Sequence, residues 1–154
     1  MFLICFILGG MVLNKYDDDQ KFTRYKYGYC SFNSLIILIV LNYIFGLFFN
    51  FQWGATKELE IIILIGITAL GFINICVYKN VFFYKHNNKR AYSWFYFIIG
   101  IVYLYRNFQT YLTYPEEIIL DGQIGIGAID LFFGLLFFSI SITYSIRTII
   151  DKMK

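Results

Sequence analysis

The sequence predicts an all-α integral membrane protein: a four-span helical bundle with an extra short apolar helix at its N-terminus. Three observations predict this class. Of 154 residues, 59% are hydrophobic and 15% are charged, whereas soluble domains carry about 25% charged residues. Long apolar runs follow one another along the chain, and the basic residues gather in alternate connections. We therefore treat residues 1–154 as a single membrane domain whose first partner is the lipid bilayer.

Four apolar runs are long enough to cross a bilayer, which needs about 20 apolar residues because its hydrocarbon core is about 30 Å thick. These runs predict membrane spans at residues 33–53, 59–78, 91–112 and 123–147. Arg106 interrupts the third run, and Asp130 lies within the fourth.

The first 14 residues, MFLICFILGGMVLN, are apolar but reach only about 21 Å as a helix, which is shorter than the hydrocarbon core. Three interpretations of residues 1–14 stay open: an interfacial or re-entrant helix, a short fifth span in a thinned bilayer, and a signal sequence. The polar residues 15–30 are expected to form a cytoplasmic connector.

Lysine and arginine predict the orientation, because connections rich in these residues stay on the cytoplasmic side. Eleven of the 13 basic residues lie in three segments: 15–30, 79–90 and 147–154. We expect these segments, including the C-terminus, to be cytoplasmic. Residues with A/T-rich codons (Phe, Tyr, Ile, Asn and Lys) are abundant. This composition favours a bacterial cytoplasmic membrane, with an organellar inner membrane as the alternative.

The outer connection between the third and fourth spans contains two local signals. Pro115-Glu116-Glu117 is typical of a helix start, because proline fits the first turn and acidic residues favour the helix N-terminus. Asp121-Gly122 is typical of a turn. We therefore expect a short interfacial helix over residues 115–120, followed by a turn into the fourth span.

Each span places polar or small residues along one face, and such faces pack inward because lipid-facing positions are apolar. The candidate intramembrane polar site comprises Asp130, Arg106, Asn107, Tyr103, Asn42, Asn50, Asn74 and Ser141. Two interpretations stay open: contacts that hold helices together, and the lining of a functional polar cavity.

Arg106 and Asp130 are the most unusual of these residues, because an ionised side chain is costly inside a bilayer. Both are expected about 10 Å into the outer half, on neighbouring helices. We hypothesise a buried ion pair between them. The alternative is that Arg106 extends outward to the interface while Asp130 borders a polar crevice.

The sequence lacks the residues that most catalytic centres need. His86 is the only histidine, which excludes a haem with two histidine ligands and a histidine-rich metal site. The cysteines have no ligand spacing, and there is no phosphate-binding loop. We expect no enzymatic activity, no cofactor and no nucleic-acid partner.

These features predict a small non-catalytic membrane protein that acts by lateral helix contacts, as an accessory subunit or an immunity- or defence-type factor. Its partner would be another membrane protein or a second copy. The alternative is a minimal transporter, lipid-linked-substrate flippase or channel with a polar bundle interior. A structural subunit of an organellar respiratory assembly is a third interpretation, suggested by the A/T-rich composition.

One stretch bears on the alternative. The sequence NICVYKNVFF at residues 74–83 precedes a basic loop and resembles the end of the second span in the GtrA-like flippases of lipid-linked sugars. The resemblance implies four short spans with both chain ends inside.

Overall fold

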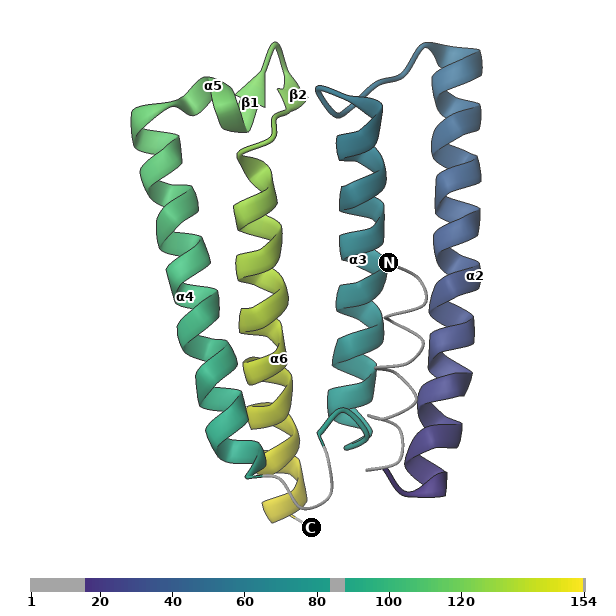
Figure 1. Cartoon of the computed structure of the whole chain (residues 1–154), viewed down its shortest axis with the longest axis vertical. Helices are drawn as coiled ribbons and strands as arrows, with labels where there is room; N and C mark the ends of the chain where they lie inside the picture. Colours follow the sequence, from purple (N-terminus) through teal and green to yellow (C-terminus); the bar gives the residue numbers. More distant parts are fainter. Residues whose placement is uncertain (1–15, 84–87, 154) are drawn as a thin grey trace.

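Four long helices dominate the computed structural model, which describes residues 16–83 and 88–153 (Figure 1). They are α2 (Asp18–Phe49), α3 (Lys57–Tyr78), α4 (Lys89–Thr113) and α6 (Ala128–Lys152). Helices α2, α3 and α6 are long and apolar enough to cross a membrane. Helix α4 does not reach that hydropathy, because it contains five tyrosines as well as Arg106. The all-α class is confirmed, and the span at 91–112 stays a prediction.

The four helices lie in a row and do not close around a shared interior (Figure 1). Helix α2 packs on α3, α3 packs on α6, and α6 packs most extensively on α4. Polar residues of the four helices are therefore distributed over three separate interfaces. The described helices therefore do not surround one shared polar interior, which the cavity interpretation would require.

Helix α2 differs from its predicted span at both ends. Residues 15–30, expected as a connector, are helical from Asp18 onward, because Asp17 and Gln20 form a capping box that starts the helix early. At the other end, Asn50 adopts a left-handed conformation with φ of 49° and ends the helix. Residues 50–53 therefore lie outside the helix, although the apolar run predicted them inside it.

The connection from α4 to α6 begins with the expected short helix, α5 (Pro115–Ile118). Strands β1 (Ile119–Leu120) and β2 (Gln123–Ile124) follow as an antiparallel hairpin. Asp121 and Gly122 form its turn with φ of 49° and 79°, the positive values that a two-residue hairpin of this kind requires. Residues 119–120 are thus strand, and the helix that corresponds to the predicted fourth span begins at Ala128 rather than at 123.

Hydrogen bonds between connecting segments join neighbouring helices at both the upper and the lower ends of the helices. At the upper end in Figure 1, the Ala55 amide donates to Ile124 O at 2.9 Å, and the Ile124 amide donates to Trp53 O at 2.8 Å. At the lower end, the side-chain amide of Gln20 donates from Nε2 to Asn80 O at 3.2 Å. These bonds tie the α2–α3 hairpin to the hairpin before α6, and the start of α2 to the end of α3.

The best-packed part of the row lies near the end of α3. Val77, Phe83 and Ile140 are buried there against aromatic side chains that include Tyr96 and Tyr144. This cluster joins α3, α4 and α6. Residues 1–14 and His86, discussed above, lie outside the described residues.

Candidate functional site

The structure does not bring the eight candidate residues together. Asp130, Arg106, Asn107 and Tyr103 lie near the upper ends of α4 and α6, and Ser141 lies at the lower part of the same interface. Asn74 joins α3 to α6, and Asn42 joins α2 to α3. Asn50 is exposed at the end of α2. Apart from Asn50, the candidates therefore form separate contacts between neighbouring helices.

The ion pair between Arg106 and Asp130 is present, with Nη2 and Oδ2 separated by 3.4 Å. It is not buried in the protein, because the Arg106 side chain is 64% exposed and the Asp130 side chain is 24% exposed. Asp130 lies in the first turn of α6, where the helix dipole stabilises a negative charge. The guanidinium carbon of Arg106 lies 6.0 Å from the centre of the Tyr103 ring.

Small residues bring α4 and α6 into close contact. A Cβ atom on Gly100 would lie 2.8 Å from the Phe138 amide nitrogen, and one on Gly134 would lie 2.8 Å from the Leu104 side chain. Such close approach is typical of membrane helices that pack without a hydrophobic driving force.

Polar side chains add hydrogen bonds at both ends of this α4–α6 contact. Ser93 and Ser141 share a buried hydroxyl–hydroxyl bond of 3.0 Å. The Asn107 amide donates to Gly127 O at 3.1 Å. Asn107 and Ser141 thus act as bridges between the two helices.

Asn74 plays the same part between α3 and α6. Its amide nitrogen donates to the Ser139 hydroxyl at 3.0 Å, and its oxygen accepts from the Thr143 hydroxyl at 2.8 Å. Because both ends of the amide are engaged, Asn74 offers no free group to a ligand.

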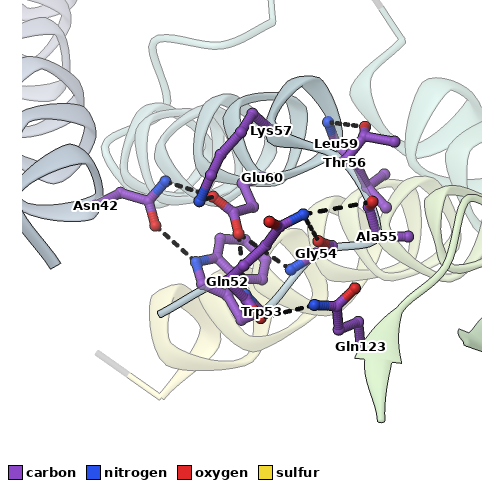
Figure 2. A network of polar contacts seen from close by, with 10 residues as sticks. All are labelled: Asn42, Gln52, Trp53, Gly54, Ala55, Thr56, Lys57, Leu59, Glu60 and Gln123. Carbon is purple, nitrogen blue, oxygen red and sulfur yellow. Dashed lines mark hydrogen bonds and ion pairs between the residues drawn. The ribbon is translucent and has the colours of Figure 1, made fainter. Parts of the chain in front are cut away.

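The densest polar network surrounds a carboxylate that the sequence analysis did not select, Glu60 (Figure 2). Glu60 as a whole is 0% exposed. One carboxylate oxygen accepts from Asn42 Nδ2 at 2.8 Å and from Lys57 Nζ at 3.1 Å. The other accepts from the backbone amides of Trp53 at 2.9 Å and Gly54 at 3.2 Å. Two helices and the loop between them thus converge on one carboxylate.

The loop that surrounds Glu60 is itself closed by hydrogen bonds. The Trp53 indole donates to Asn42 Oδ1 at 2.7 Å, and Gln52 donates to Gly54 O at 3.0 Å. Gln123 from the β2 strand donates to Gln52 O at 3.2 Å (Figure 2). The loop is therefore fixed to both helices and to the hairpin.

Local sequence explains why this loop folds around Glu60. Thr56 caps α3 by accepting from the Leu59 amide at 3.2 Å, as threonine does at helix starts. Glu60 follows in the first turn, where the helix dipole favours a negative charge. At Gly54, a Cβ atom would lie 2.8 Å from Glu60 Cγ. Glycine is needed there because the backbone approaches the carboxylate closely.

Sequence reasoning did not select Glu60, although it is the second residue of the predicted span at 59–78. One signal was available. Glu60 stands at the boundary of an uninterrupted apolar run and three residues after Lys57, within reach of an i,i+3 pair.

These contacts hold the helices and the loop together. The Glu60 carboxylate is saturated by four donors. Within residues 16–83 and 88–153, no three histidine, cysteine or acidic side chains form a group suited to a metal ion. Comparisons with protein-family models, curated proteins and solved structures find no match to this chain. The resemblance of residues 74–83 to GtrA-like flippases thus gains no support from the family models.

Proposed function

We propose that this is a small non-catalytic membrane protein that acts by lateral helix contacts, with α2 as its contact helix. One observation carries the proposal. Helix α2 has 32 residues but buries none of them, and among the described elements its extensive packing is with α3 alone. It stands at one end of the row of described helices, and within residues 16–83 and 88–153 no other helix packs extensively on its remaining surface (Figure 1).

The exposed surface of α2 contains a stripe suited to another helix. Its members recur at steps of three and four residues and lie within about 80° of one another on the helix. They are Phe22, Tyr25, Tyr29, Phe32, Ile36 and Val40, and all are exposed. Steps of three and four residues also place side chains into a facing helix in coiled-coil packing.

The alternative, a minimal transporter, flippase or channel, would need polar groups that face a common path. Asn42, Asn74 and Ser141 instead bond to neighbouring helices at three different interfaces. If the protein acts by lateral contacts, these hydrogen bonds hold the four helices together while α2 binds its partner.

We also propose that the lower end in Figure 1 faces the cytoplasm, in a bacterial cytoplasmic membrane. The start of α2, the start of α4 and the end of α6 all lie at that end, and each carries basic residues. Lys57 and Arg106 belong to the upper half. The helix directions therefore agree with the distribution expected from lysine and arginine counts.

Photo-crosslinking in native membranes tests the contact function. A photoreactive phenylalanine analogue in place of Tyr29 should give a discrete protein adduct, whose mass distinguishes a second copy from another membrane protein. The same analogue in place of Phe95, which is 59% exposed on α4, serves as the control and should react with lipid alone. Lipid adducts alone at both positions would contradict the proposal.

A further inference from the structure

A groove of about 560 Å³ lies between the start of α4 and the end of α6. It is separate from the Glu60 network, and its lining shares Ser93 and Ser141 with the α4–α6 contact and Tyr144 with the aromatic cluster near the end of α3. Its lining includes Arg90, Trp94, Phe97, Ser145, Ile149 and Lys152. Its volume is in the range of sites that hold small organic ligands.

Positive charge is concentrated at the end of this groove. Arg90 is the second residue of α4, and Lys152 is the last residue of α6. The nearest acid in sequence, Asp151, is engaged by Arg147 at 3.1 Å. Within the part of the chain that the structure describes, neither Arg90 nor Lys152 forms an ion pair, so both charges are available to an anion.

Further along the helices the groove is lined by aromatic and apolar side chains, beside hydroxyl groups that bond to one another or to carbonyls of their own helix. From Arg90 to Phe97, α4 rises by about 10 Å, and Trp94 and Phe97 line this length. Trp94 and Ile149 are each 57% exposed, so the walls reach the outer surface of the two helices. The groove thus combines a cationic end with an apolar length that opens sideways.

We propose that this groove binds an anionic phospholipid, with the phosphate between Arg90 and Lys152 and the first part of an acyl chain along Trp94 and Phe97. A free phosphate ion would use the two charges and leave the aromatic walls without a partner. A lipid contacts both the two charges and the aromatic walls. Basic residues at the cytoplasmic end of membrane helices attract anionic headgroups. This inference depends on the membrane location and not on α2 as a contact helix.

Native mass spectrometry of the detergent-purified full chain tests the proposal by counting bound lipids during titration. Phosphatidylglycerol and phosphatidylcholine with identical acyl chains are compared. Phosphatidylglycerol has no cationic headgroup that would oppose Arg90 and Lys152, so it should bind several-fold more tightly than phosphatidylcholine. The double variant Arg90→Gln/Lys152→Gln should lose this preference.

Two further variants separate the site from general charge effects. Lys26→Gln/Lys79→Gln removes two exposed charges from the same end of the molecule but outside the groove, and should keep the preference. Ser145→Leu fills the groove without changing its charge, and should weaken phosphatidylglycerol binding even if the double variant folds poorly.

The proposal is overturned by equal affinity of the natural chain for the two lipids. It is also overturned if a folded double variant retains its preference, or if the Lys26→Gln/Lys79→Gln control loses as much as that variant. A final arm adds inorganic phosphate. Full displacement of the lipid at millimolar phosphate would identify a site for a soluble anion and contradict the lipid assignment.

Discussion

The Asn42 amide donates to the Glu60 carboxylate at 2.8 Å across the interface between α2 and α3. The oxygen of the same amide accepts from the Trp53 indole at 2.7 Å. Asn42 therefore joins the buried acid to the loop that covers it. A buried charge is tolerated only when its hydrogen bonds are satisfied, and this arrangement satisfies them from three directions.

Replacing this acid by its amide should destabilise the protein. In Glu60→Gln, one carboxylate oxygen becomes an NH₂ group, which must face donors on either side of the site. We expect a loss of about 3 kcal/mol, the cost of breaking a buried charged network. Thermal or SDS-induced unfolding in detergent measures it. The exposed Glu58→Gln in the same helical turn is the control and should change little; equal behaviour of the two variants would refute the structural role of Glu60.

Close approach at Gly54 gives a second prediction. A Cβ atom there would lie 2.8 Å from Glu60 Cγ and 3.2 Å from Thr56 O. We expect Gly54→Ala to cost about 1–3 kcal/mol because overpacking displaces the carboxylate or the loop. At Gly71, within α3, nothing lies within 4 Å of the added atom, and Gly71→Ala should stabilise the helix by about 0.5–1 kcal/mol. Opposite signs in unfolding measurements are the expected result.

How far the sequence could predict the fold is clearest at α3 and α6. The run at 59–78 has apolar residues up to Tyr78 and a threonine cap before it, and the observed helix extends the prediction by only two residues, to Lys57. The run at 123–147 begins with Gln123 and Ile124, which suit a strand as well as a helix. The Asp121-Gly122 turn gives residues 123–124 a partner strand, and the helix starts five residues later than expected.

The candidate site was predictable only as a set of inward faces. The pairing of Arg106 with Asp130 followed from two charges on neighbouring helices. The separation of Asn42 from Asn74 did not follow, because helical periodicity gives the direction of a side chain but not which helix lies beside it. Glu60 was also missed, because its burial depends on a loop that folds back over it.

The contact between α4 and α6 should depend on Gly100. An added Cβ atom would lie 2.8 Å from the Phe138 amide nitrogen, a backbone atom that cannot rotate away. We expect Gly100→Ala to force the helices apart and to cost about 2 kcal/mol. Gly66→Ala, where nothing lies within 4 Å, is the matched control in α3. A Gly100→Ala protein as stable as the control would contradict the close packing.

The proposed orientation can be tested by labelling with a membrane-impermeant maleimide. In a background with the native cysteines replaced, Asp121→Cys should react in intact cells, because the hairpin lies at the upper end (Figure 1). Lys152→Cys should react only after the membrane is permeabilised, since positive connections stay inside. The reverse pattern would overturn the topology.

The exposure of the Arg106–Asp130 pair predicts a weak interaction. In a double-mutant cycle with Arg106→Gln and Asp130→Asn, we expect a coupling energy of about 0.5–1 kcal/mol in detergent, the range of exposed ion pairs. Added salt should reduce this coupling. Asp130→Asn should cost more than Arg106→Gln, because Asp130 also interacts with the N-terminus of α6, a contribution of about 0.5 kcal/mol that survives removal of the arginine.

The Arg147–Asp151 pair within α6 supplies the matched control. Its nitrogen and oxygen lie 3.1 Å apart, with the side chains 30% and 55% exposed. A cycle on this pair should give a coupling of about 0.3–0.5 kcal/mol, as for other i,i+4 pairs. A coupling above about 3 kcal/mol for Arg106 and Asp130, against this small value, would show a desolvated pair. That result would restore the buried ion pair first inferred from the sequence.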